Sequence, residues 1–99
     1  MTATPRSPQT PTLANVSSSA SSVTLFEANT AAVARFLYND SSAVLYLKYG
    51  TTAASTTSYT VQVAAGGFYE FPGSPCYNGK VTGIWASANG AARTTEVTG

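Results

Sequence analysis

Apolar and polar side chains alternate with a period of two from residue 22 onward, and no long segment has the periodicity of a helix. The clearest stretches are residues 22–28, SVTLFEA, residues 34–40, ARFLYND, and residues 43–50, AVLYLKYG. Further strands are predicted at residues 58–64, 68–71, 80–87 and 92–97. Residues 28–34, ANTAAVA, favour helix by composition but are too short to form one alone. The pattern predicts an all-β protein, an antiparallel β-sandwich or small barrel of about six to eight strands.

Short polar links separate these segments and predict where the chain turns. They are residues 40–42, 66–67, 78–79 and 89–90. Asp and Ser side chains bond to the backbone of turns, Gly accepts positive φ, and Asn-Gly is typical of tight hairpin turns. We therefore expect residues 35–50, RFLYNDSSAVLYLKYG, to fold as one β-hairpin and residues 58–71 to fold as another.

The first 21 residues differ from the rest of the chain. They contain three prolines at three-residue spacing, many Ser and Thr, and one charged residue, a composition that favours an extended chain. We expect residues 1–21 to form an extended or flexible N-terminal arm and residues 22–99 to form a single β-sandwich domain. The arm is either a disordered tail or a segment that orders on a neighbouring subunit. Because it has few apolar side chains besides Leu13 and Val16, we expect it to be dispensable for folding and to contribute to assembly.

Charged residues make up only 9% of the chain, against roughly 25% in an average soluble protein. The surface must therefore consist mainly of Ser, Thr, Ala and Tyr, and such a surface resists association less than a charged one. We expect a partner to cover part of it. The net charge is +1 and the five cations are scattered, which argues against nucleic-acid binding, because that requires clustered cations.

Residue types that carry most catalysis are scarce. The chain has no His, and so lacks the commonest general base and transition-metal ligand. Its one cysteine, Cys76, has no cation near it in the sequence that would activate the thiol. The four acidic residues form no metal-binding pattern. We therefore expect no enzymatic activity, no metal site and no cofactor.

Aromatic side chains offer the best candidates for contacts. Most of those in strands are expected to pack inside the sandwich, where burial stabilises the fold. Tyrosine also provides a large contact area at low entropy cost, which suits an interface. The candidate interface residues are Leu13, Val16, Tyr46, Tyr49, Phe68 and Tyr69.

Trp85, together with Tyr69 and Tyr77, has two possible roles. The apolar neighbours Val81 and Ile84 favour a position for Trp85 in the core. Alternatively, these rings stack on sugars in a carbohydrate-binding site. A glycan site would gather aromatics at one loop end, whereas an assembly protein spreads apolar contacts along an edge or a face.

Localisation signals are sparse. No apolar run approaches the roughly 20 residues of a membrane span, and the start, MTATPRSPQTPTLANV, has no apolar core of a secretory signal. A single cysteine fits synthesis in a reducing compartment. We expect synthesis in a host cytoplasm and no membrane contact.

The segments YNDSSAVLYLKYG, VAAGGFYEFP and GKVTGIWASANGAARTTEV together resemble a family of small all-β phage virion proteins, found as capsid decoration (cement) proteins. The similarity covers about residues 22–98 and contains no catalytic motif. The resemblance implies a homotrimer on the capsid surface of the virion that binds the major capsid protein and bridges capsid subunits. Two alternatives stay open: a phage tail or adsorption subunit that binds host glycan, and a small carbohydrate-binding β-sandwich module.

Overall fold

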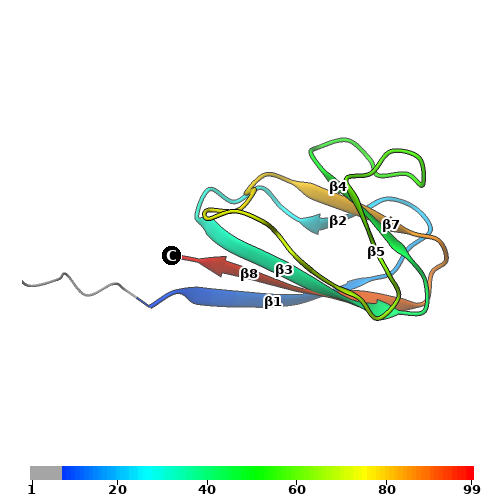
Figure 1. Ribbon diagram of the computed structural model, residues 1–99, viewed down its shortest axis with the longest axis horizontal. Helices are drawn as coiled ribbons and strands as arrows, with labels where there is room; N and C mark the ends of the chain where they lie inside the picture. Colours follow the sequence, from blue (N-terminus) through cyan, green and yellow to red (C-terminus); the bar gives the residue numbers. More distant parts are fainter. Residues whose placement is uncertain (1–7) are drawn as a thin grey trace, which may run out of the picture.

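The computed structural model describes residues 8–99 and contains eight strands in two four-stranded sheets. Figure 1 shows the two sheets as the two layers of a sandwich. No helix occurs in this part of the chain. The predicted all-β fold is therefore confirmed, in the form of an antiparallel β-sandwich.

The first sheet has the strand order β1-β8-β3-β6. Its strands are β1 (Thr10–Ser17), β8 (Gly90–Thr98), β3 (Ala32–Ser41) and β6 (Phe68–Glu70). The second sheet has the order β2-β7-β4-β5. Its strands are β2 (Val23–Phe26), β7 (Val81–Trp85), β4 (Leu45–Tyr49) and β5 (Val61–Val63). All pairings in both sheets are antiparallel.

Consecutive strands lie in opposite sheets, with the single exception of β4 and β5. The pairs are nested: β1 pairs with β8, β2 with β7, β3 with β6 and β4 with β5. This arrangement is that of a jelly roll, a double sheet built from two Greek keys. As a result, strands from the two ends of the sequence are neighbours in each sheet (Figure 1).

The prediction of two β-hairpins is wrong. β3 and β4 belong to different sheets, as do β5 and β6, and so neither pair is hydrogen-bonded. Between β3 and β4, the side chain of Asn39 turns inward and its amide nitrogen donates to the carbonyls of Ala43 at 2.9 Å and Val63 at 3.0 Å. These bonds hold the link as a corner between the two sheets. Gly66 does take the expected positive φ, 72°, but its turn also joins opposite sheets.

The N-terminal segment differs in part from the expected arm. Its residues 10–17 form β1, which pairs with β8 of the same chain from Thr10↔Thr98 to Ser17↔Ala91. Almost all side chains of β1 are exposed on both faces, so the segment lacks the alternation by which a half-buried strand is recognised. Residues 1–7 of the expected arm lie outside the described residues.

The core lies between the sheets. Its largest apolar members are at most 1% exposed, and they are Leu37, Leu45, Leu47, Val81 and Trp85. The burial of Trp85 confirms the core interpretation and removes this ring from any sugar-binding site. Gly83 on β7 is part of the same packing, because an added Cβ would come within 2.6 Å of Leu25 Cδ1. A larger residue at this position would therefore require the Leu25 side chain to shift.

Candidate docking surface

Strand β3 partly reverses the usual in-and-out pattern, since Leu37 faces the core and Asp40 faces solvent but two other inward residues are polar. Its inward side chains include Arg35 and Asn39, both 0% exposed, whereas Phe36 and Tyr38 point away from the core. Buried polar groups destabilise a fold unless each finds a hydrogen-bonding partner. Both inward residues must therefore have partners, and the aromatic residues are left on the outside.

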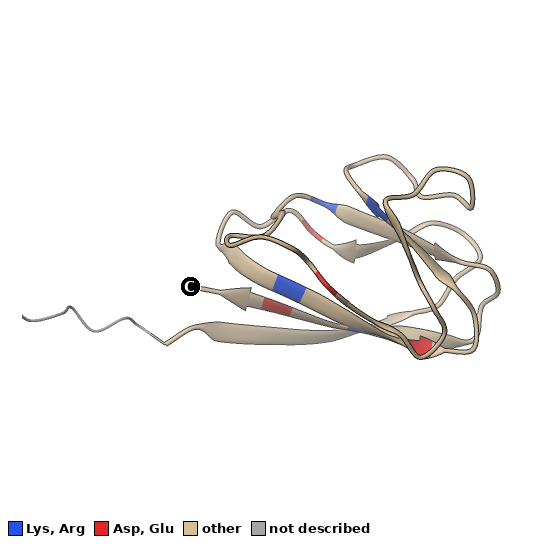
Figure 2. Ribbon diagram, viewed as in Figure 1, with Lys and Arg blue, Asp and Glu red and all other residues tan. Residues whose placement is uncertain are grey.

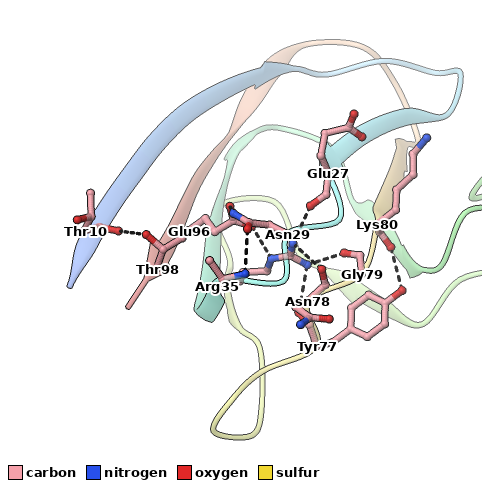
Figure 3. A network of polar contacts seen from close by, with 11 residues as sticks. Thr10, Glu27, Asn29, Arg35, Tyr77, Asn78, Gly79, Lys80, Glu96 and Thr98 are labelled. Carbon is pink, nitrogen blue, oxygen red and sulfur yellow. Dashed lines mark hydrogen bonds and ion pairs between the residues drawn. The ribbon is translucent and has the colours of Figure 1, made fainter. Parts of the chain in front are cut away.

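Arg35 directs all five of its N–H groups to acceptors inside the sandwich (Figure 3). Its Nε donates to Glu96 Oε2 at 2.8 Å. Its terminal nitrogens donate to the backbone carbonyls of Glu27, Tyr77, Asn78 and Gly79. Arg35 thus ties the loop after β2 and the loop before β7 to the middle of the first sheet.

Glu96 on β8 is held from two sides. Its second oxygen, Oε1, accepts a hydrogen bond from Asn29 Nδ2 at 2.8 Å. The guanidinium carbon of Arg35 also lies 4.9 Å from the centre of the Phe26 ring, a cation–π contact. In the described residues, no buried side-chain nitrogen or oxygen lacks a partner. The cluster is therefore a structural support rather than a site with a polar atom available to a substrate.

Asn39 forms a second buried network at the other end of β3. Its Nδ2 also donates to the carbonyl of Ala64 at 3.1 Å. Its Oδ1 accepts from Trp85 Nε1 at 3.0 Å and from Ser41 Oγ at 2.8 Å. One buried amide thus joins β3, β7 and the ends of two links between the sheets.

The outward side chains of the first sheet form a largely apolar surface. We call it the aromatic face, and it consists of Leu13, Phe36, Tyr38, Phe68, Thr95 and Val97. Cross-strand pairing places Tyr38 beside Phe68, and the rings of Phe36 and Phe68 are 5.8 Å apart. Leu13 is 73% exposed, Phe68 60% and Tyr38 42%. Large apolar side chains thus face solvent on β1, β3 and β6.

Charged residues lie on β3, β6 and β8 of this sheet (Figure 2). Asp40 and Arg93 lie on the same outward side but pair with each other at 2.9 Å. Glu70 on β6 is paired with Phe36 in the strand register. A partner that covers the aromatic face would therefore have to desolvate or pair with Glu70, whereas Asp40 and Arg93 already neutralise each other.

The outer side of the second sheet is partly covered by the chain itself. The loop between β4 and β5 crosses it, since Thr82 Oγ1 donates to the carbonyl of Thr52 at 3.1 Å. The same loop reaches the start of β2, where the N–H of Ala54 donates to Ser22 Oγ at 3.0 Å. The two outer sides therefore differ, and the aromatic face is the more open one.

A smaller aromatic group remains beside this loop. The ring of Tyr46 meets the ring of Tyr59 edge-on, with centres 5.1 Å apart. Gln62 Nε2 donates to the hydroxyl of Tyr59 at 2.7 Å. We call Tyr46, Tyr59 and Gln62 the tyrosine pair site.

The structure separates the six candidate interface residues. Leu13 and Phe68 lie on the aromatic face, on β1 and β6, which are the two edge strands of the first sheet. Tyr46 lies on the outer side of the second sheet, in the tyrosine pair site. These three residues are therefore accessible, but they do not form one continuous surface.

The other three candidates face the interior. Val16 and Tyr69 pack against the core. Tyr49 is stacked between Phe71 and Tyr77, with ring centres 5.2 Å and 4.6 Å away, and its hydroxyl lies 2.8 Å from that of Tyr69. Burial, with a smaller contribution from the Tyr69 hydrogen bond, raises the pKa of the Tyr49 hydroxyl. The stacking also occupies one face of Tyr77, which was a candidate for sugar binding.

Sequence reasoning missed Phe36 and Tyr38 as surface residues. The alternation correctly places both on one side of the strand and Arg35 on the other. It does not indicate which side is inside. The usual preference of charged residues for solvent predicts that Arg35 faces outward, which is incorrect here. The signal that could have identified the inward side was the presence of Arg and Asn on the same side of a long strand.

The described residues offer little for catalysis. A groove of about 300 Å³ lies between β1, β8 and β2, but the carboxylate on its wall, Glu96, is already bonded to Arg35 and Asn29. No group of three or more His, Cys, Asp or Glu in residues 8–99 could hold a metal ion. Cys76 is buried. The aromatic face is therefore the strongest candidate for a functional surface.

A scan against protein-family models, a search of curated proteins and a search of solved structures each found no match to this chain. In residues 8–99, no helix is long and apolar enough to cross a membrane. The physical properties of the aromatic face are therefore one basis for a proposed role.

Proposed function

We propose that this chain is a structural subunit of a phage particle, a capsid decoration protein that binds the outer shell of the head through its aromatic face. The observation that carries the proposal is the partly reversed pattern of β3. Its core positions hold Arg35 and Asn39, which need many partners, while Phe36 and Tyr38 are outside. A partner that covers the aromatic face provides a physical reason for this arrangement.

The energetics favour docking at this face. Burial of a large apolar side chain contributes roughly 1.5–3 kcal/mol, and Leu13 and Phe68 lack most of this contribution in the isolated chain. Aromatic residues also dominate the binding energy of many interfaces. Covering the face also desolvates Glu70 and the Asp40–Arg93 pair, which offsets part of this gain.

The capsid role draws on the sequence resemblance, and the fold is compatible with it. Jelly rolls occur in viral capsid domains and also in lectins, so the fold alone does not choose between these functions. A homotrimer that binds the major capsid protein would repeat one contact three times and gain avidity. Binding only to the assembled shell would then stabilise the shell by mass action.

Binding to phage heads that lack this chain tests the proposal. The purified protein is mixed with such heads, the bound fraction is measured by sedimentation, and the saturated particles are examined by cryo-electron microscopy. We expect density on the shell, with the aromatic face against the major capsid protein. The variant Tyr38→Ser/Phe68→Ser should weaken binding at least about tenfold.

The matched control is Tyr59→Ser, which removes an aromatic ring of similar exposure, 39%, from the loop before β5, beside the other sheet. It should bind like the parent protein. Density confined to the tail, or equal weakening by the two variants, would contradict the proposal. Thermal unfolding of each free variant shows whether the fold itself is unchanged.

Glycan binding is a second candidate function, and the tyrosine pair site is the observation that favours it. Rings such as Tyr46 and Tyr59 can stack on a sugar, and the amide of Gln62 can hydrogen-bond to hydroxyl groups. This would suit a tail or adsorption subunit, or a carbohydrate-binding module. A glycan array measures it: binding that is lost in Tyr59→Ala but kept in Phe68→Ser would support this function over the capsid role.

A further inference from the structure

β1 is the longest edge strand of the sandwich. The four edges in residues 8–99 are β1, with eight residues, β2 with four, and β5 and β6 with three each. Edge strands are usually short, charged, bulged or covered, because their free backbone groups invite pairing with another chain. β1 has no charged residue and no register shift along its pairing with β8. Pro11 is the only such protective feature in it.

The direction of the backbone groups of β1 follows from its pairing. The N–H of Ser18 donates to the carbonyl of Gly90 at 3.0 Å, which continues the register that ends at Ser17↔Ala91. Hydrogen-bonded and non-hydrogen-bonded residues alternate along an antiparallel pair. The even-numbered residues of β1 are therefore bonded to β8. The backbone groups directed to the free edge belong to Pro11, Leu13, Asn15 and Ser17.

We propose that this edge pairs with β1 of a second copy of the chain, antiparallel and around a twofold axis. The pairing joins the first sheets of the two copies into one continuous sheet. A second β1 is the only edge in residues 8–99 that matches the length of the first, since the others have three or four residues. The inference concerns the edge of β1 and does not depend on the proposed function of the aromatic face.

The register of this pairing is determined by the free groups. All four odd-numbered residues are used when Leu13 pairs with Asn15 of the second copy and Pro11 pairs with Ser17. Ala14 then lies on the twofold axis, opposite Ala14 of the second copy. Because proline has no N–H, one hydrogen bond is missing at each end of the pair.

The contact is small. One strand-to-strand contact covers less than the roughly 1,600 Å² of a standard interface, so we expect a reversible equilibrium between monomer and dimer. A twofold contact does not itself build a trimer. In a decoration layer it would join copies that belong to neighbouring trimers.

A cysteine at the axis tests the register. In a Cys76→Ala background, Ala14→Cys places two thiols directly opposite each other, at a Cα separation of about 4.5 Å that a disulfide can span. We expect a covalent dimer under mild oxidation. Thr12→Cys is the matched control, because it lies on the same side of β1 but away from the axis, and it should stay monomeric.

A proline in the edge tests the hydrogen bonds. The N–H of Asn15 faces the free edge, so Asn15→Pro removes an intermolecular donor without breaking a bond to β8. Sedimentation equilibrium should show a dimer for the parent protein and for Asn15→Ala, which keeps the N–H. It should show at least about tenfold weaker association for Asn15→Pro.

Three results would overturn the inference. They are a strict monomer at every attainable concentration, an oligomer that Asn15→Pro does not weaken, and equal cross-linking of the Ala14→Cys and Thr12→Cys proteins. Circular dichroism and thermal unfolding of each variant at low concentration establish that the fold is intact. The proline test uses the native cysteine, so it stands if the Cys76→Ala background is unstable.

Discussion

Arg35 and Glu96 lie directly opposite each other on β3 and β8, and their charged groups are 2.8 Å apart inside the sandwich. The arginine side chain is fully buried, whereas the glutamate side chain keeps 18% exposure. The same guanidinium also holds two loops through their carbonyls. The stability of the first sheet and the positions of those loops therefore depend on one buried ion pair.

Replacement of Arg35 by Met should destabilise the fold strongly. The variant keeps an apolar side chain of comparable length, but it leaves Glu96 and several buried carbonyls without their donor. Removal of one partner of a buried pair typically costs about 3–5 kcal/mol. Denaturant unfolding followed by circular dichroism measures the change.

The exposed pair between Asp40 and Arg93 provides the control. Its side chains are about half exposed, and exposed ion pairs contribute about 1 kcal/mol or less. Arg93→Met should therefore leave the free energy of unfolding nearly unchanged. If both methionine variants lose the same free energy, Arg35 does not support the fold in the way that its buried contacts indicate.

Asn39→Ala should also destabilise the fold, by about 3 kcal/mol. The substitution leaves Trp85 Nε1 buried without an acceptor and removes one donor each from the carbonyls of Ala43 and Val63. The indole fluorescence of the only tryptophan reports the change in its surroundings, and urea unfolding gives the loss of free energy. Asn15→Ala, on the exposed edge of β1, should change the free energy by no more than about 0.5 kcal/mol.

Stability should fall at alkaline pH, partly because of Tyr49. Burial raises the pKa of its hydroxyl above the ordinary value of 10.0, so the folded protein keeps this proton after the unfolded chain has lost it. The contribution of this proton to the free energy of unfolding is complete below about pH 10 and decreases as the pH rises further. Tyr49→Phe has no proton to lose and should show a shallower decrease.

Thermal unfolding between about pH 8 and 11 measures this difference. Tyr38→Phe on the aromatic face is the matched control for the loss of a phenol. The slope of the thermal midpoint against pH is compared, rather than the midpoint itself, because Tyr49→Phe also lacks the hydrogen bond to Tyr69. A Tyr49→Phe profile parallel to that of the parent protein would contradict the prediction.

Truncation distinguishes the two parts of the N-terminal segment. Deletion of residues 1–9 leaves β1 intact and should leave the thermal midpoint unchanged. Deletion of residues 1–17 removes β1, exposes the backbone of β8 and uncovers the core contact of Val16. We expect a loss of about 2 kcal/mol, measured by calorimetry. Equal midpoints for both deletions would show that β1 is dispensable, as the sequence composition suggested.

The fold class was predictable from sequence because period-two alternation is a local signal. Residues 22–28 and 43–50 alternate clearly, and both contain a strand of the second sheet. The partners of each strand were not predictable in the same way. Polar links such as residues 40–42 suit a hairpin turn, but in this chain the contacts of Asn39 with Ala43 and Val63 make a corner between sheets.

The candidate surface was predictable only in part. Leu13 and Phe68 were predicted from their residue types, and both are exposed. Phe36 and Tyr38 were not predicted at the surface. The side of β3 that faces the core depends on hydrogen-bonding partners of Arg35 that are distant in the sequence, such as Glu96. Tyr49 and Tyr69 were expected at an interface, but their hydroxyls are hydrogen-bonded to each other.

The nested order of the strands has a consequence during synthesis. β8 lies between β1 and β3 in the first sheet, yet it is the last of these strands to leave the ribosome. Until it emerges, β1 has no partner and one side of β3 stays unpaired. Nascent chains that lack β8 should therefore remain sensitive to protease, and the native sheet should appear only once β8 has left the ribosome.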